Sequence, residues 1–280
     1  MPHNCTIIGF GKVGKTLSLL FRESPAHCLF SRIISRTLPA EHSLNQIEIL
    51  TVEHLKTIQG VTALTVPDNA IGTLSEKLST QCSIVPGSIV FHCSGVHTSH
   101  ELAAVKAKGA FTASIHPALS FGDPVESSKY FKGTVCTYEG DQEALAILLP
   151  MFESLGAKLI PIDPQQKAKY HAACCIASNY LVGLYALSEN IVASTGLSSE
   201  SIPSILLPLM HSALNNLAQK SPIDALSGPI ARNDVSTINL HTQNLSGEYL
   251  SYYKYLGNLL IHQTGLKDRA EILKILLEKD

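Results

Sequence analysis

The sequence contains no stretch of about 18 uncharged apolar residues, the length that a membrane-spanning helix needs, so we expect no membrane partner. It also lacks a strong charge of either sign. The formal net charge is -2 over 280 residues, which gives no reason to expect a nucleic-acid partner. With 45% hydrophobic and only 16% charged residues, the chain does not resemble a disordered one. Its length allows about two domains and a sizeable core.

The sequence also lacks paired cysteine motifs. It has seven cysteines, an odd number, and none forms a CxxC pair. Adjacent Cys174 and Cys175 lie in an apolar helical stretch and are typical of buried thiols. We therefore predict no disulfide framework and no metal site. The amino terminus has no charged region followed by an apolar one, so a secretory signal is not expected and the predicted location is the cytoplasm.

Internal repeats and low-complexity segments are absent. Instead, the first half alternates short apolar runs with polar helical stretches. The runs that we predict as strands are Cys5 to Gly9, Leu29 to Ile34, Val61 to Val66, Ser88 to Cys93, Ala110 to Ser114, Gly133 to Tyr138 and Lys158 to Ile162. This alternation predicts an α/β fold, a Rossmann domain with a mostly parallel sheet covered on both faces.

The second half carries no convincing strand. Its helical patterns are Gln165 to Ser194, Ser199 to Gln219 (interrupted by Pro203 and Pro208), Val235 to Asn244, Tyr249 to His262 and Lys267 to Glu278. We therefore predict two domains, a nucleotide-binding Rossmann domain over residues 1–164 and an all-helical domain over residues 165–280.

A glycine turn follows the first predicted strand and opens a helix. Its residues are Gly9, Phe10, Gly11, Lys12, Val13 and Gly14. A bare GxGxxG pattern is a weak signal, but the strand–turn–helix context makes it a strong one for a dinucleotide. The first glycine permits the tight turn, the second lets the backbone approach a pyrophosphate, and the third lets helix and strand pack closely. An ordinary glycine-rich turn is the alternative.

The end of the second predicted strand indicates which dinucleotide is bound. An NAD site usually has a carboxylate there, which accepts from the ribose hydroxyl. This sequence has Ser35, Arg36 and Thr37 instead. A guanidinium flanked by two hydroxyl donors can hold a 2′-phosphate, so we predict NADP(H) as the cofactor. The alternative is that Arg36 is a solvated surface residue.

Two further loops follow predicted strands. They contain Val66, Pro67 and Asp68 in the first loop and Ser94 in the second. Ligands of open α/β sheets lie at the carboxyl ends of the strands, so we expect these residues to border the nicotinamide half of the cofactor. They can also be plain strand-ending turns.

Polar residues occur where a substrate is expected. His116 follows a predicted strand, and His171 and Asn179 lie on one face of the long helix, about 12 Å apart along its axis. Lys167 shares that face, whereas Lys169 points about 200° away from His171. Polar groups on an otherwise apolar face need partners, which can be a substrate or a neighbouring helix. Arg232, in a turn before a helix, can clamp a substrate carboxylate or can pair with Asp234.

Together these segments resemble a bacterial family. The matching residues are the GFGKVG turn, Val66-Pro67-Asp68, His92-Cys93-Ser94-Gly95, His116-Pro117, the helix from Tyr170 to Asn179, and Gly228-Pro229-Ile230-Ala231-Arg232. The family joins a Rossmann-like domain to a helical domain of unknown function, DUF2520, and is related to ketopantoate reductases, pyrroline-5-carboxylate reductases and 6-phosphogluconate dehydrogenase. The resemblance implies a homodimer and, for some members, reduction of 2-dehydropantoate to pantoate in pantothenate synthesis.

One departure bears on the substrate. The ketopantoate reductase pattern places a lysine four residues before an asparagine, whereas this chain has Cys175 four residues before Asn179. We expect His171 to donate the proton, since an unperturbed histidine pKa of about 6.5 suits that task, with Lys167 or Lys169 as alternatives. Asn179 would hold the substrate oxygen, Arg232 the carboxylate, and His116 would assist. A cyclic-imine reductase and a non-catalytic NADP(H)-binding sensor remain the alternative functions.

Overall fold

The computed structural model describes residues 3–24, 26–35 and 47–278. The chain folds into two compact units, Met1–Ser178 and Asn179–Asp280. The division falls inside one long helix, α6 (Lys167–Ala193). The predicted domain boundary at residues 164 and 165 lies at the start of a short helix, η4 (Pro164–Gln166), and stays a prediction.

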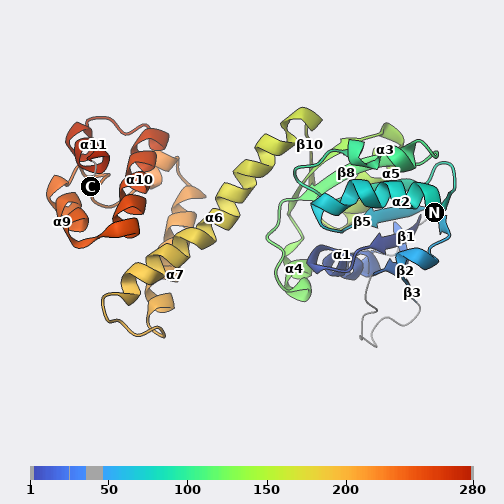
Figure 1. Cartoon of the computed structure of the whole chain (residues 1–280), viewed down its shortest axis with the longest axis horizontal. Coiled ribbons are helices and arrows are strands. Elements are labelled where there is room, and N and C mark those ends of the chain that lie inside the picture. Colours follow the sequence, from blue (N-terminus) through green and yellow to red (C-terminus); the bar gives the residue numbers. More distant parts are fainter. Residues whose placement is uncertain (1–2, 25, 36–46, 279–280) are drawn as a thin grey trace. The chain divides into compact units, whose positions relative to one another are not determined.

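An eight-stranded sheet forms the centre of the first unit (Figure 1). Its strands, in their order across the sheet, are β10 (Lys158–Pro161), β9 (Val135–Gly140), β8 (Phe111–Pro117), β7 (Ile89–His92), β5 (Val61–Leu64), β1 (His3–Ile8), β2 (Cys28–Ile34) and β3 (Glu48–Leu50). Every neighbouring pair is parallel except β8 and β9. The predicted α/β fold with a mostly parallel sheet is therefore confirmed. A separate pair joins β4 (Thr57–Ile58) to β6 (Ser83–Ile84).

Helices cover both faces of this sheet. Successive side chains of a strand point to opposite faces, and so Ile7 and Ile8 belong to different core clusters. The Ile7 cluster packs against α1 (Lys12–Glu23) and α5 (Gln142–Ser154). The Ile8 cluster packs against α2 (Ile71–Gln81) and α3 (Ala103–Lys106). A further helix, α4 (Pro124–Tyr130), contacts α1.

The strand register aligns the carboxyl ends of β1, β5 and β7 with Ser114, which lies within β8. Ile8 pairs with Leu64, Leu64 with His92, and His92 with Ser114. Residues that follow this row are therefore brought to one edge of the sheet, where ligands of such folds bind. The glycine turn and the loops after β5 and β7 begin there, and β8 continues past this row to Pro117.

The described residues of the second unit, 179–278, contain helices and no strand, as the sequence predicts. The helices that follow α6 are α7 (Ile202–Leu217), α8 (Pro222–Ala225), α9 (Val235–Asn244), α10 (Gly247–Thr264) and α11 (Ala270–Leu277). Ile238, Ile261 and Ile272 form the centre of their core. No helix in the described part of the chain is both long and apolar enough to cross a membrane.

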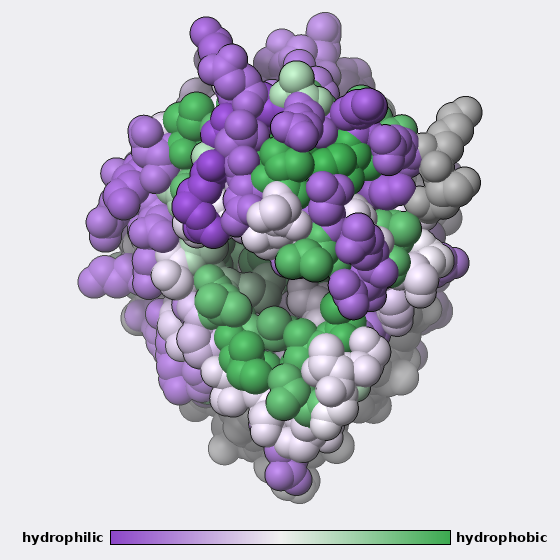
Figure 2. Space-filling view, turned by 90° about the vertical axis from the view of Figure 1, so that its left-hand side faces the viewer, coloured by the Kyte–Doolittle hydropathy of each residue, from purple (hydrophilic) through white to green (hydrophobic). Residues whose placement is uncertain are grey.

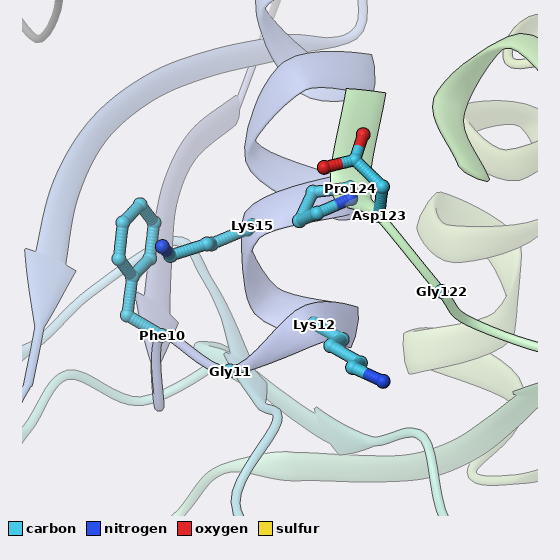
Figure 3. Close-up of a pocket in the computed structure, with 7 residues that line it drawn as sticks. All are labelled: Phe10, Gly11, Lys12, Lys15, Gly122, Asp123 and Pro124. Carbon is cyan, nitrogen blue, oxygen red and sulfur yellow. The ribbon is translucent and has the colours of Figure 1, made fainter. Parts of the chain in front are cut away.

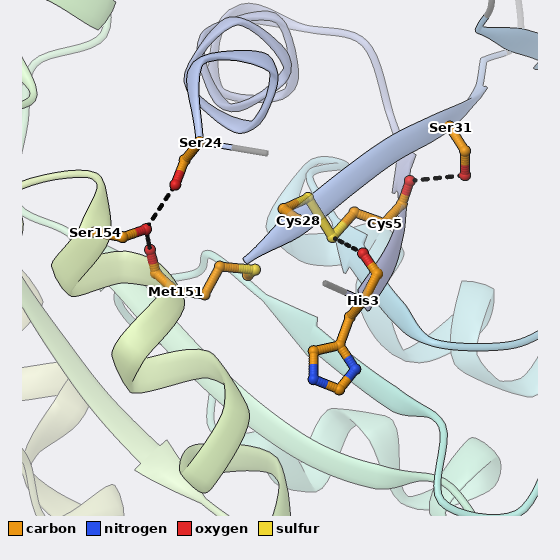
Figure 4. The surroundings of a disulfide bond; sticks show 7 residues. All are labelled: His3, Cys5, Ser24, Cys28, Ser31, Met151 and Ser154. Atoms are coloured by element: carbon orange, nitrogen blue, oxygen red, sulfur yellow. Dashed lines mark hydrogen bonds between the residues drawn. A yellow bond between two sulfur atoms is a disulfide. The ribbon is translucent and has the colours of Figure 1, made fainter. Parts of the chain in front are cut away.

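Cys5 and Cys28 form a disulfide between β1 and β2 (Figure 4). Both residues are buried, and their Cα atoms lie 5.9 Å apart. The sequence predicted no disulfide framework, and this single disulfide departs from that expectation. The odd cysteine count could not exclude it, because strand pairing brings together two residues that are 23 positions apart in the sequence. The predicted cytoplasmic location is not tested by this pair and stays a prediction.

Candidate functional site

The glycine turn connects β1 to α1, and each glycine has a different reason to be there. Gly9 adopts a φ of 101°, which favours glycine, and an added Cβ would lie 2.7 Å from the Thr65 carbonyl oxygen. At Gly14 a Cβ would run into the Gly9 carbonyl and lie 2.6 Å from Thr65 Oγ1. These two glycines are therefore required by the packing of β1, α1 and the residue that follows β5.

Gly11 is different, because nothing in the described structure requires a glycine there. Its φ is -78°, which any residue adopts, and an added Cβ would meet no atom within 4 Å. Gly11 is also the N-cap of α1 and has no side chain with which to bond the free N–H groups of the first turn. Those N–H groups and the positive end of the helix dipole remain available to an anion. The missing side chain leaves room for a ligand beside the backbone.

A cavity of about 520 Å³ opens beside this end of α1 (Figure 3). Its lining residues are Phe10, Gly11, Lys12, Lys15, Gly122, Asp123 and Pro124. Two of these are lysines, and Lys15 Nζ lies 5.6 Å from the centre of the Phe10 ring. The Asp123 carboxylate accepts from the N–H groups of Val125 and Glu126 and thereby caps α4. The cavity thus combines two ammonium groups with a free helix amino terminus, a combination suited to phosphate.

The other predicted cofactor residues that the structure describes follow strands β2, β5 and β7 of the sheet. Ser35 follows β2, and its N–H donates to the Leu50 carbonyl. Arg36 and Thr37 lie outside the described residues. Val66, Pro67 and Asp68 follow β5, and Val66 packs against the core while Asp68 is exposed. Ser94 is buried, and its hydroxyl accepts from the N–H groups of Val96 and His97, so it already has a structural role in its loop.

Two predicted catalytic residues are brought together. His116, from β8, and His171, from α6, have ring centres 5.6 Å apart with their planes at 84°. Tyr170 Oη lies 3.2 Å from His116 Nδ1, and Cys175 Sγ lies 3.9 Å from both ring nitrogens of His171. Gly95 closes the group, since an added Cβ would collide with His171 Cδ2 and lie 2.8 Å from His116 Nε2. All of these residues belong to the first unit.

Electrostatics set the protonation of one of these histidines. Burial lowers the pKa of His116 to about 4, with further contributions from the positive charges of His171 and Lys167. His116 is therefore neutral at pH 7. At Nδ1, the neutral imidazole either accepts a hydrogen bond from the Tyr170 hydroxyl or donates one to it, depending on the tautomer, and its other nitrogen has the opposite role. This hydrogen bond orients the His116 ring beside the carboxyl end of β8.

Lys167, an alternative proton donor in the sequence, has a different environment from Lys169. Lys167 is fully buried, and its Nζ donates to the Ser94 carbonyl (3.2 Å) and to Ser114 Oγ (2.8 Å). Lys169 is exposed. Neither residue lies in the His116–His171 contact itself. Among the described residues, no three histidine, cysteine or acidic side chains lie close enough together to hold a metal ion.

Comparison with known protein families identifies two domains in the chain. Residues 3–117 match a Rossmann-like domain, and residues 134–260 match a domain of unknown function, DUF2520. The chain therefore carries a Rossmann-like domain followed by a DUF2520 domain. No curated protein sequence matches it.

Solved structures resemble this DUF2520 protein over almost its whole length. Protein TM1727 from Thermotoga maritima is 27% identical with a TM-score of 0.67, covering 93% of this chain and 98% of that one. A putative NADP oxidoreductase, BF3122 from Bacteroides fragilis, is 17% identical with a TM-score of 0.71, covering 94% and 97%. Plasmodium falciparum pyrroline carboxylate reductase, solved with NADP bound, is 11% identical with a TM-score of 0.60, covering 96% and 98%. The last two likenesses show a shared fold.

The remaining predicted site residues of the DUF2520 protein belong to the second unit. Asn179 is the first residue of that unit. Arg232 is exposed in the turn before α9, and Arg269 holds this turn by donating to the carbonyls of Ile230 and Ala231. The carboxylate of Asp234 accepts from Thr237 N and caps α9. The roles of Asn179 and Arg232 stay predictions.

Sequence reasoning gave no role to Tyr170 and Gly95, although each is adjacent in sequence to a residue that it did select. The signal for Tyr170 was its position immediately before His171. The signal for Gly95 was a glycine that directly follows Ser94, at the end of a strand where ligands approach.

Proposed function

We propose that this protein is an NADP(H)-dependent oxidoreductase that reduces a small carboxylate substrate, with 2-dehydropantoate as the first candidate. The observation that carries the proposal is Gly11, a glycine without a structural reason, beside a free helix amino terminus and two lysines. A dinucleotide pyrophosphate supplies that reason. Two solved structures of the same fold support the choice of cofactor: a putative NADP oxidoreductase and a pyrroline carboxylate reductase with NADP bound.

The residues present fit such a cofactor. The N–H groups of the Gly9–Gly14 turn would hold the pyrophosphate, with Lys12 and Lys15 beside it. Ser35, Arg36 and Thr37 would hold the 2′-phosphate, an assignment that rests on the sequence. When bound, NADPH supplies a hydride. The chain itself must supply a proton and must orient the substrate.

His171 is the residue that we assign to the proton. Its ring lies edge-on against the neutral His116, which is itself hydrogen-bonded to Tyr170, and this contact orients the His171 ring. Asn179 would hold the substrate oxygen and Arg232 the carboxylate. Both assignments rest on the sequence and are tested by mutation.

The direct test is NADPH consumption by the purified protein with 2-dehydropantoate. We expect turnover, and we expect His171→Ala and Asn179→Ala to lower kcat by roughly 100-fold or more while NADPH still binds. Unchanged turnover in both variants would remove the assignment of the proton donor and the oxygen ligand. Cofactor binding without turnover against a broad panel of carbonyl compounds would favour a non-catalytic sensor.

A second candidate is reduction of a cyclic imine such as pyrroline-5-carboxylate. It is favoured by the likeness to pyrroline carboxylate reductase and by the neutral state of His116. An iminium carbon needs less acid catalysis than a ketone, so His171→Ala would then cost little. Measuring kcat/KM for both compounds, in the wild type and in His171→Ala, separates the two functions.

A further inference from the structure

Lys167 is a charged residue whose burial the fold does not explain. Its side chain is fully buried at the first position of α6. Moving an ammonium group out of water costs free energy, and an apolar side chain of similar volume would avoid that cost. The ammonium has two hydrogen-bond acceptors, the Ser94 carbonyl oxygen and Ser114 Oγ. These bonds offset part of the cost, and they also determine what the residue connects.

The two hydrogen bonds join α6 to β8 and to the loop after β7. These three segments carry His171, His116 and Gly95. Ser94 directly precedes Gly95, whose backbone lies against both imidazoles. Ser114 is two residues before His116 on β8, and side chains two apart on a strand share a face. Lys167 itself is four residues, or about one helical turn, before His171 on α6. Lys167 and its two acceptors are therefore each close in sequence to a residue of the His116–His171 contact.

The acceptors of Lys167 are themselves fixed by further buried groups. Ser114 Oγ also lies 3.4 Å from His92 Nδ1, which accepts from Ser94 N. His92 Nε2 donates to the Thr98 carbonyl, so its tautomer is determined. Burial lowers the pKa of His92 to about 4, which keeps this ring neutral. Lys167 therefore binds to uncharged groups that are themselves hydrogen-bonded to the neutral His92.

Charged and titratable groups surround the two residues in question. Those that act on Lys167 are Glu139 on β9, Cys93 after β7 and Asp68 after β5, and those that act on His116 are His171, Lys167 and Asp68. Glu139 is buried, and its carboxylate accepts from the N–H and the hydroxyl of Ser99. Burial lowers the pKa of Lys167, and the charge of Glu139 opposes that effect. A protonated Lys167 disfavours a second positive charge on His116.

We propose that Lys167 is a positioning residue, whose buried ammonium holds the start of α6, and with it His171, against the ends of β7 and β8 and places a positive charge near His116. It does not donate a proton to substrate, because its Nζ is buried between two protein oxygens. The catalytic meaning of this role rests on the reductase function proposed above. The contact and the charge effect do not, and they are open to a separate test.

The test is an NMR titration of the histidine side chains in the full-length ¹⁵N-labelled protein, without cofactor or substrate. Lys167→Met keeps the length and apolar stem of the side chain and removes its charge. Lys169→Met, which alters an exposed lysine in the same helical turn, is the matched control. We expect the pKa of His116 to rise in Lys167→Met and to stay at the wild-type value in Lys169→Met. An unchanged His116 pKa in Lys167→Met would overturn the proposal.

Lys167→Gln is the second variant if Lys167→Met does not fold, because an amide can still donate to the Ser94 carbonyl while carrying no charge. It must raise the pKa of His116 in the same way. In the wild type, the Lys167 Nζ protons must be protected from solvent exchange at pH 7, and fast exchange would contradict the buried bridge.

A kinetic measurement then connects the bridge to turnover. With NADPH and whichever of the two candidate compounds is reduced, Lys167→Met should lower kcat by roughly 10- to 100-fold while the KM for NADPH stays near the wild-type value. If the protein binds no NADPH, the proposed function fails, but the titration still decides whether Lys167 controls His116. If NADPH is consumed and Lys167→Met has wild-type kcat, the positioning role is wrong and the proposed function stands.

Discussion

Gly95 is the residue on which the contact between the two histidines depends most directly. Its φ is not positive, so an alanine there meets no backbone strain, and the whole effect of a Cβ is its collision with the two imidazoles. Substitution at this position therefore tests the geometry of the pair without removing any polar group.

For Gly95→Ala we predict a loss in kcat of roughly 10- to 100-fold and a cost of about 1–3 kcal/mol in the free energy of unfolding. The rings of His116 and His171 must move apart to admit the methyl group. Steady-state kinetics and denaturant unfolding measure the two effects. Gly183→Ala, at a helical glycine where a Cβ meets nothing within 4 Å, is the control and should keep wild-type kcat. Equal kcat in the two variants would show that the pair is not needed.

His92 gives a prediction about stability and pH. Its pKa is about 4 in the folded protein, mainly because of burial, against about 6.5 in an unfolded chain. As the pH falls from about 6.5 to about 4, the unfolded chain therefore binds a proton that the folded protein does not. Stability is fully present above the unfolded pKa and falls through this window, by an amount on the order of 3 kcal/mol. The lowered pKa of His116 acts in the same direction.

Urea unfolding at a series of pH values measures this dependence. His92→Gln should flatten the loss of stability between pH 6.5 and 4, whatever its effect at pH 7. His100→Gln, at an exposed histidine, should keep the wild-type slope. A wild-type slope in His92→Gln would show that His92 is not buried in its neutral form.

At the residue scale, the sequence could predict the glycines and both histidines, because their positions after strands and on one helix face follow from local pattern alone. It could not predict that Lys167 is buried or that Tyr170 bonds His116. Both facts depend on how α6 docks against β8, which is a tertiary relation. The Cys5–Cys28 pair was missed for the same reason, since it depends on the register of β1 with β2.

At the scale of the elements, the turn between β1 and α1 carries three glycines on which the proposed cofactor site depends. The three glycines have separable reasons: Gly9 for its backbone conformation, Gly14 for helix–strand packing and, as we propose, Gly11 for ligand approach. This separation makes a matched pair of substitutions possible.

We predict that Gly11→Ala changes the free energy of unfolding by no more than about 1 kcal/mol, since the methyl group enters open space at a helix N-cap. The same methyl group should weaken NADPH binding by roughly tenfold or more, because it occupies the place of the pyrophosphate. Gly14→Ala should instead destabilise the fold, by about 1–3 kcal/mol, through its collision with Gly9 and Thr65. Calorimetric titration and thermal unfolding separate the two. NADPH affinity that is unchanged in Gly11→Ala would remove the main support for the cofactor site.

The elements that the sequence predicted are those with a strong period or a long apolar run, such as β1, β5, β7 and α6. The short strands β3, β4 and β6 were missed, since two or three residues carry no periodic signal. The antiparallel pairing of β9 with β8 was also not predictable, because an apolar run does not record its direction. The last helix begins at Ala270 rather than Lys267, within the usual uncertainty of helix ends.

For the whole molecule, several large apolar side chains of the second unit are exposed. Its exposed side chains include Leu207, Leu209 and Leu217 on α7 and Tyr255 on α10. Figure 2 shows hydrophobic side chains gathered around a hollow on one face of the protein. Apolar patches of this kind mark association surfaces, and we expect a second copy of this chain as the partner.

Light scattering after size-exclusion chromatography tests the expected homodimer. The wild type should have the mass of two chains, and Leu209→Glu should shift it towards one chain by placing a charge on an apolar surface. Lys220→Glu, a charge change at an exposed polar position of the same unit, should leave the dimer intact. A wild-type protein with the mass of one chain would contradict the expectation.

The measurement that tests the central claim most directly is a titration of the folded wild-type protein with NADPH and, separately, with NADH. If the first βα turn holds a pyrophosphate and the residues after β2 hold a 2′-phosphate, NADPH saturates at submillimolar concentration and NADH binds more weakly. Equal binding of the two cofactors would contradict the NADP preference. No binding of NADPH at millimolar concentration would contradict the cofactor site and, with it, the proposed reductase.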